Sequence, residues 1–164
     1  MIGNKMKRII IIILISLIFS ISIYCQAYKQ SNDMDLKVVH DFVESINSAN
    51  VDRIYDLMTI DHVFIDSQGN KMIGNENMKN AWIGYFSLFP DYKIEITDTL
   101  QNDSIIVLLG FASGTYKTNK GSSDKNNYWR VPASWKAIVD DEKIKFWQVY
   151  ADNSVVIGII NKNK

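Results

Sequence analysis

The stretch DFVESINSANVDRIYDLMTIDHVFIDSQG, residues 41–69, decides the fold, because the spacing of its apolar residues changes from helical to extended. Apolar residues at helical spacing predict an amphipathic helix over residues 34–48. A second short helix is expected over residues 50–59, and its first residue, an asparagine, is a favourable cap. From His62 to Asp66 the pattern is that of a brief strand, closed by turn residues 67–70.

The following part of the chain predicts one more helix and then strands. Residues 75–89 carry an aromatic face at helical spacing and stop at Pro90, because the residue before a proline avoids helical geometry. Four strands follow, with a polar loop over 118–127 and a tight turn at Asp140–Asp141: 92–97, 104–116, 128–139 and 142–152. The order predicts an α+β domain whose strongly curved antiparallel sheet wraps around helices and forms a cone.

The first 27 residues have the pattern of a secretory signal. Three basic residues among the first eight precede an apolar run over residues 9–23, which is shorter than the roughly 20 residues that span a bilayer. We therefore expect cleavage near Ala27 and export to the periplasm or the medium, with membrane contact only through an uncleaved signal. Lipid anchoring at Cys25 is the alternative, and the bulky Tyr24 before it disfavours that modification.

The predicted division of the chain has four parts. Residues 1–27 are the signal peptide and residues 28–33 a polar linker, followed by the domain over residues 34–153. Residues 154–164 form a tail that is first apolar and then polar. This tail is either an extra strand or a cover for a pocket or a partner.

Composition excludes several classes of function. The whole chain has 18 basic and 18 acidic residues, and the signal removes only basic ones, so the mature protein is mildly acidic and nucleic acid is not expected as a partner. The single cysteine lies in the signal, so neither disulfides nor thiol chemistry is expected after cleavage. The two histidines lack the spacing of a metal site, and we expect no metal and no other cofactor.

A second informative stretch is DEKIKFWQVYAD, residues 141–152. Together with residues 41–69 it resembles the SnoaL-like, nuclear-transport-factor-two-like superfamily, and the resemblance spans residues 34–153. It implies a cone-shaped α+β fold. It leaves the activity open, since this fold hosts isomerases, cyclases, epoxide hydrolases, dehydratases and noncatalytic binding domains.

The resemblance also assigns roles to particular positions. Similarity to ketosteroid isomerases implies that Asp66 is a general base at the mouth of the cone. Their oxyanion-binding tyrosine corresponds to Phe42 and their protonated acid falls near Ser134, which disfavours steroid isomerisation. Asp152 matches the aspartate that ends the last strand in limonene epoxide hydrolase-like and SnoaL-like enzymes. Epoxide opening also needs an arginine and a second carboxylate, which Gly110–Gly114 does not supply.

Three side chains are candidates for acid-base chemistry: Asp66, Asp152 and His62. By strand alternation His62 shares a face with Phe64 and Asp66, and two residues along a strand span roughly 7 Å, so a direct hydrogen bond between them is not assured. Each candidate also has a purely structural interpretation. The aspartates are typical turn residues, and the histidine is typical of an exposed strand start.

Aromatic residues are the most conspicuous feature of the mature chain, with four tryptophans in a small domain. Trp129 and Trp135 lie six residues apart and share one face of a strand. That face either lines the cone, where it suits a flat apolar ligand, or forms a homodimer interface on the outer side of the sheet. The expected lining residues are Phe42, Phe64, Trp82, Phe86, Ser134 and Trp147.

Three functions are compatible with these patterns. The leading hypothesis is an exported domain, dimeric through its sheet, that binds a small hydrophobic molecule in an aromatic-lined cone without catalysis. The second is an isomerase, polyketide-cyclase-like or dehydratase enzyme that uses Asp66 as its general acid or base. The third is a noncatalytic module that binds another protein.

Overall fold

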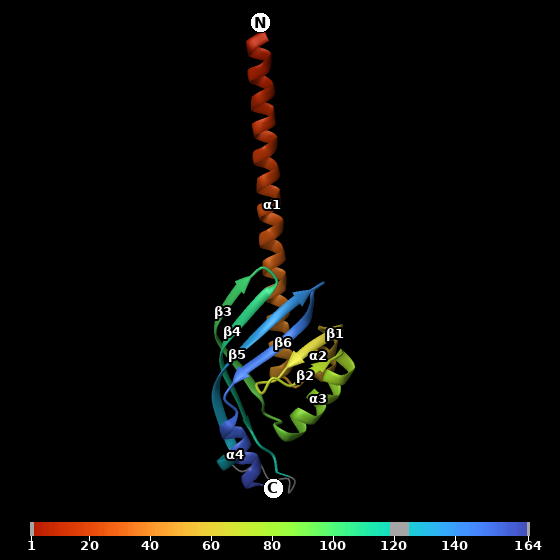
Figure 1. Ribbon diagram of the computed structural model, residues 1–164, viewed down its shortest axis with the longest axis vertical. Helices are drawn as coiled ribbons and strands as arrows, with labels where there is room; N and C mark the ends of the chain where they lie inside the picture. Colours follow the sequence, from red (N-terminus) through yellow and green to blue (C-terminus); the bar gives the residue numbers. More distant parts are fainter. Residues whose placement is uncertain (1, 119–124, 164) are drawn as a thin grey trace. The chain divides into compact units, whose positions relative to one another are not determined.

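The computed structural model describes residues 2–118 and 125–163 (Figure 1). The chain forms two compact units, Met1–Met34 and Asp35–Lys164. Helix α1 (Ile2–Asn47) runs through both of them, so residues 28–33, predicted to be a linker, are helical. Within the part of the chain that is described, no helix combines the length and apolarity needed to cross a membrane.

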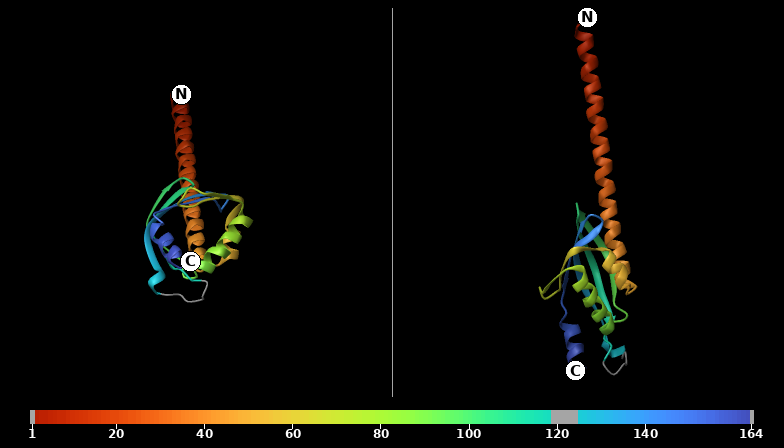
Figure 2. Two further views of the ribbon diagram at one scale, coloured as in Figure 1. Left: turned by 60° about the horizontal axis from the view of Figure 1, so that its bottom comes forward. Right: turned by 90° about the vertical axis from the view of Figure 1, so that its right-hand side faces the viewer.

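The second unit is built on one six-stranded sheet, with strand order β2-β1-β6-β5-β4-β3. The strands are β1 (Met58–Ile65), β2 (Lys71–Ile73), β3 (Lys93–Asn102), β4 (Ile105–Thr115), β5 (Tyr128–Asp140) and β6 (Lys143–Ala151). The last four form the expected antiparallel meander. Figure 2 shows that the sheet curves around the helices and stays open, which confirms the predicted α+β cone.

Three helices accompany the sheet in this unit besides the end of α1. They are α2 (Val51–Asp56), α3 (Asn75–Leu88) and α4 (Ser154–Lys162), with a 3-10 turn, η1, at Lys125–Asn127. Asn50 caps α2 as predicted, since its side chain accepts a hydrogen bond from the Arg53 N–H at 3.0 Å. Helix α3 begins at Asn75, and Gly74 occupies its N-cap position without a side-chain hydrogen bond. Part of the predicted loop 118–127 lies outside the described residues.

The sheet differs from the prediction in its first two strands. Strand β1 begins four residues before the predicted start at His62 and pairs in parallel with β6, so the sheet is mixed. The short strand β2 was not predicted and pairs antiparallel with β1. A parallel pairing between the first and last strands is nonlocal, and three-residue strands carry too short a pattern to recognise in sequence.

The hairpin and the tail differ more locally. The tight turn between β5 and β6 is at Asp141 and Glu142, one residue later than predicted, and both have positive φ, as a two-residue type I′ turn requires. The tail is helix α4 rather than an extra strand. Its Val156 is buried, and Ile159 and Ile160 pack against the core.

The core lies between the inner face of the sheet and the helices. Its largest fully buried side chains include Trp135 and Trp147 from the sheet and Phe42 and Ile46 from α1. Residues of β5 alternate between buried and more exposed from Tyr128 to Asp140, so the odd-numbered ones face inward. This alternation carries Trp129 and Trp135 to the inner face of the sheet, next to the helices.

Candidate functional site

A cavity of about 170 Å³ remains between the inner face of the sheet and α3. Seven of its lining residues are aromatic: Phe64, Trp82, Tyr85, Tyr92, Trp129, Trp135 and Trp147. The other lining residues are small, aliphatic or polar: Asp66, Ser67, Met78, Ala81, Ile94, Ala112, Val149, Ala151 and Asn153. The cone is therefore neither empty nor completely filled by its own side chains.

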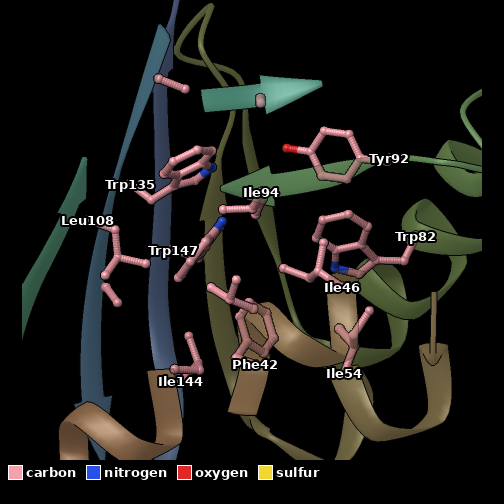
Figure 3. Close-up of a cluster of buried hydrophobic side chains, with 14 of the residues drawn as sticks. Phe42, Ile46, Ile54, Trp82, Tyr92, Ile94, Leu108, Trp135, Ile144 and Trp147 are labelled. Atoms are coloured by element: carbon pink, nitrogen blue, oxygen red, sulfur yellow. The ribbon is translucent and has the colours of Figure 1, made fainter. Parts of the chain in front are cut away.

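Helix α3 and three strands of the sheet supply most of the aromatic wall. On α3, Met78, Ala81, Trp82 and Tyr85 line the cavity, and this spacing of three, four and seven residues is one face of a helix. On the sheet, Trp135 of β5 lies opposite Val149 of β6, and Phe64 of β1 lies beside Trp147 of β6. Figure 3 shows Trp135 and Trp147 on one side of the gap and Tyr92 and Trp82 on the other.

The rings on the helix side hold one another at steep angles. Trp82 meets Tyr85 edge-on, with 5.8 Å between ring centroids and 89° between planes. Tyr85 meets Tyr92 in the same way at 5.0 Å and 89°. Edge-to-face pairs of this kind are the favoured packing of aromatic rings. The aromatic rings on this side of the cavity are consequently set at steep angles to one another.

Several polar atoms of these aromatic side chains are buried. The indole nitrogens of Trp82, Trp129 and Trp135 are inaccessible to solvent and have no hydrogen-bond partner, although that of Trp135 faces the Tyr92 hydroxyl (Figure 3). Burial raises the pKa of Tyr85 and of Tyr92 well above the ordinary value for a phenol. Both phenols are therefore neutral at physiological pH and are too weakly acidic to exchange protons there.

Asp66 lies at the edge of the cavity, as predicted from the sequence, and is the sole charged side chain among the described lining residues. Its Oδ1 accepts hydrogen bonds from the backbone N–H groups of Gln68 (2.9 Å) and Asn70 (2.8 Å). Its Oδ2 accepts one from the side-chain amide of Asn70 at 2.9 Å. Asp66 therefore has the structural role of a turn residue, because its carboxylate closes the β1–β2 turn.

These contacts determine the charge of Asp66. Partial burial raises the pKa of the carboxyl group, but the hydrogen bonds from Asn70, Gln68 and Gly69 outweigh it and leave the pKa below its ordinary value. The group is ionised at neutral pH and is a weaker base than a free aspartate. It can attract a positive charge more readily than it can remove a proton.

A hydrogen bond between two loops lies beside this carboxylate. Asn153, which precedes α4, donates its side-chain amide to the Ser67 hydroxyl at 2.7 Å. Both residues line the cavity. The β1–β2 turn and the β6–α4 connection are therefore joined where the cavity opens.

His62 does not line the cavity and is buried in the core, contrary to the expectation of an exposed strand start. Its Nδ1–H donates to the carbonyl oxygen of Ile144 at 2.7 Å, and its Nε2 has no partner. Burial lowers the pKa of the imidazole more than the Ile144 carbonyl and the nearby Asp61 carboxylate raise it. His62 is neutral, and the structure does not bring it together with Asp66.

Asp152 also lies outside the cavity lining, on an exposed position before α4. Its carboxylate accepts a hydrogen bond from the Ser154 N–H at 2.9 Å, and the bonds from the Ser154 backbone and side chain lower its pKa. This is the turn chemistry that the sequence offered as the structural interpretation of the residue.

Three of the six expected lining residues are elsewhere. Phe42 is fully buried behind the wall, with its ring edge-on to Trp147 at 5.1 Å. Phe86 stacks on Trp82 at 5.2 Å and supports it from outside the cavity. Ser134 lies on the outer face of the sheet, because its strand neighbour Trp135 points inward and successive residues alternate. Phe64, Trp82 and Trp147 line the cavity as expected.

Tyr85 and Tyr92 are the aromatic lining residues that the sequence analysis missed. Tyr85 follows Trp82 by three residues, so helical spacing alone would have assigned it to the same wall. Among the described residues, no group of three or more histidine, cysteine, aspartate or glutamate side chains is close enough to hold a metal ion. What the site offers is a largely apolar aromatic enclosure with one carboxylate at its edge.

Comparison with solved structures places this architecture among known folds. A protein of ketosteroid isomerase-like fold from Catenulispora acidiphila DSM 44928, solved in complex with trimethylamine, has a TM-score of 0.64 and 18% identity, covering 74% of this chain and 89% of its own. A protein from Jannaschia sp. CCS1 assigned as a SnoaL-like polyketide cyclase has a TM-score of 0.69 and 15% identity, covering 79% and 93%. An LEH-like epoxide hydrolase from M. tuberculosis has a TM-score of 0.65 and 10% identity, covering 80% and 92%.

Sequence comparison identifies the family. A comparison with curated proteins finds no match. The family model of the SnoaL-like domain, in contrast, matches residues 39–147, which is more than half of the chain and includes most of the residues that line the cavity. Together with the open cone of the fold, this match shows that the chain belongs to the SnoaL-like domain family.

Proposed function

We propose that this protein is an exported SnoaL-like domain that binds one small hydrophobic molecule in its aromatic cavity and does not convert it. The observation that carries the proposal is the cavity itself, a space of about 170 Å³ that seven aromatic side chains line. A void of this size costs packing energy in an unliganded core, so a protein gains stability when a ligand fills it.

The size of the cavity bounds the ligand. An apolar cavity of about 150 Å³ is sufficient to hold benzene, whereas pockets for drug-sized ligands run from about 300 Å³ upward. We therefore expect a molecule of about one ring or one compact branched group. A multi-ring polyketide or a steroid would require the aromatic walls to move apart.

Export is the second part of the proposal. It rests on the basic start of the chain and the apolar run over residues 9–23, followed by small side chains near Ala27. The expected mature protein begins at Tyr28, and lipid anchoring at Cys25 is the alternative. N-terminal sequencing of the protein recovered from outside the cytoplasm distinguishes a free amine at Tyr28 from a modified Cys25.

Dimerisation through the outer face of the sheet is the third part. On that face Ser134 lies between Leu109 and Tyr150 across three neighbouring strands. The flanking side chains are 37% and 50% exposed, which is high for a leucine and a tyrosine in the middle of a sheet. A second copy of the same face would cover these apolar groups in a symmetric contact.

One observation favours an enzyme as the second candidate function, namely that Asp66 lines the cavity. An isomerase, cyclase or dehydratase would use this carboxylate as general acid or base. Asp66→Asn then abolishes turnover while binding persists. If the protein only binds its ligand, the wild type shows no turnover, and the substitution therefore changes none.

Native mass spectrometry of the protein purified gently from its own host tests the proposal. We expect a mass increase from one small molecule per chain, which denaturation releases for identification. Trp135→Ala, which opens the wall, should lose the bound mass, while Ser134→Ala, on the outer face, should keep it. Protein that carries no small molecule, and that binds none from an extract of its host, would contradict the proposal.

A further inference from the structure

We infer that the small molecule in the cavity is a methylated ammonium ion, a cation whose methyl groups give it a hydrophobic surface; this inference rests on the proposed binding function. Two features of the site combine to select this class: electron-rich rings on several sides and a single carboxylate at the edge. Neither feature alone would distinguish a cation from a neutral apolar ligand.

The rings provide the attraction for a positive charge. A cation over the face of an aromatic ring is attracted by the negative potential of that face, and tryptophan is the strongest partner. All four tryptophans of the chain line the cavity, together with Tyr85 and Tyr92. Desolvation strengthens the attraction, and Trp135 and Trp147 are almost completely buried.

The angles between the rings indicate the shape of the ligand. A slot for a flat ring compound would need two roughly parallel walls. Here Tyr85 stands at 89° to both Trp82 and Tyr92, while Trp82 and Tyr92 are tilted by 41° to each other. Rings set at several angles to one another do not form such a slot and fit a compact, rounded group such as a trimethylammonium head, for which a cavity of about 170 Å³ is sufficient.

The charges around the cavity agree with a cation and oppose an anion. The described lining residues include no lysine, arginine or histidine, so a bound anion would be buried without a partner. The Asp66 carboxylate is held in its charged form by three hydrogen bonds within its own turn. It can therefore neutralise a cation at the cavity edge without rearranging.

A pair of probes with the same shape and different charge separates charge recognition from simple apolar filling. Choline carries a trimethylammonium head, and 3,3-dimethyl-1-butanol carries a neutral tert-butyl group in the same place. We expect titration calorimetry of the exported protein, purified as its host delivers it, to show choline binding at least about tenfold more tightly. Equal or tighter binding of the neutral alcohol overturns the inference and leaves the proposed binding function intact.

Two variants test the contributions of the carboxylate and the rings. Asp66→Asn should weaken choline binding by about fivefold and leave the alcohol unchanged, whereas Asp98→Asn, at an exposed position of β3, should change neither. Trp135→Phe keeps an apolar wall with a weaker ring potential and should weaken choline binding selectively. Loss of both probes by the same factor in these variants also overturns the inference. If neither probe binds to the wild type, the inference fails, and native mass spectrometry then decides separately whether the cavity holds another small molecule.

Discussion

Gly110 lies in β4 at the bulge where its pairing with β3 shifts between Ile96 and Asp98. A Cβ atom at this position would lie 1.9 Å from the carbonyl oxygen of Glu95 and 2.9 Å from its carbonyl carbon. Both atoms belong to the backbone of a paired strand and cannot rotate away. Glycine is therefore required at this position because the backbones of β3 and β4 approach each other closely.

Gly110→Ala is expected to lower the free energy of unfolding by about 3 kcal/mol, because the strands must separate to accept the methyl group. Gly84→Ala is the matched control. Gly84 is exposed on α3 with open space around its Cα, so alanine should stabilise the helix by about 1 kcal/mol. Urea unfolding followed by tryptophan fluorescence measures both, and equal effects of the two substitutions would contradict the assignment.

His62 makes the stability of the fold depend on pH. Because burial lowers its pKa in the folded state, the unfolded chain binds the proton more readily than the folded one. The free energy of unfolding should then fall as the pH drops below about 6.5, the ordinary histidine value, by at most about 1.4 kcal/mol per pH unit. Asp66 and Asp152 also have a lowered pKa, but their protonation reduces the free energy of unfolding only at lower pH, near and below the ordinary pKa of an aspartate.

Urea unfolding at pH 7 and pH 5 measures this dependence. His62→Gln should reduce the difference between the two pH values, whatever its effect on the absolute stability. His40→Gln, at an exposed position of α1, should keep the wild-type difference. If the difference persists in His62→Gln and vanishes in His40→Gln, then His40 causes the pH dependence and the prediction is wrong.

At the scale of elements, Asn47 joins the end of α1 to the start of β3. Its side-chain amide donates to the Ile94 carbonyl oxygen at 2.9 Å, and its Oδ1 accepts from the Ile94 N–H at 2.7 Å. The side chain thus makes both hydrogen bonds that a neighbouring strand would make. Ile94 is buried and lines the cavity, so this contact also positions the cavity wall.

Asn47→Ala should destabilise the protein by about 2–4 kcal/mol, since it leaves a buried N–H and a buried carbonyl without partners. Asn50→Ala serves as the comparison, because it removes only the exposed cap of α2 and should cost about 1 kcal/mol. Thermal unfolding by circular dichroism should rank the two variants in that order. The reverse order would show that the α1–β3 contact is not important for stability.

At the scale of the whole molecule, the mass of the protein in solution tests the proposed dimer. We expect sedimentation velocity of the protein to give the mass of two chains. The double substitution Leu109→Glu and Tyr150→Glu places two charges on the outer sheet face and should give a monomer. Ile83→Glu, at a position of similar exposure on α3, should leave the dimer intact. A monomeric wild type would exclude this arrangement.

Local patterns in the sequence were enough to predict most elements of the fold and half of the expected cavity wall. Apolar spacing predicted α2, α3 and the meander, and the aromatic face of α3 led directly to Trp82. Strand β2 and the parallel pairing of β1 with β6 depend on contacts between distant segments. The helical tail depends on tertiary packing as well, since its Val156 is buried and Ile159 and Ile160 pack against the core. Residues 28–33 continue α1 while remaining largely exposed, so the linker prediction failed on local helix formation and not on packing.

For the candidate site, the sequence by itself determined which residue types are available: four tryptophans, eight tyrosines and an aspartate before a turn. The spacing of residues along the sequence decides which of them share one face of a helix or strand. Only the tertiary structure decided which face points inward, because that depends on how the sheet curves over the helices. In the folded chain Trp135 points toward the cavity and Ser134 points away from it, and His62 is buried in the core. Asp66 accepts hydrogen bonds within its own turn. The cavity of about 170 Å³ lies between segments that are distant in the sequence, so no local pattern could have predicted it.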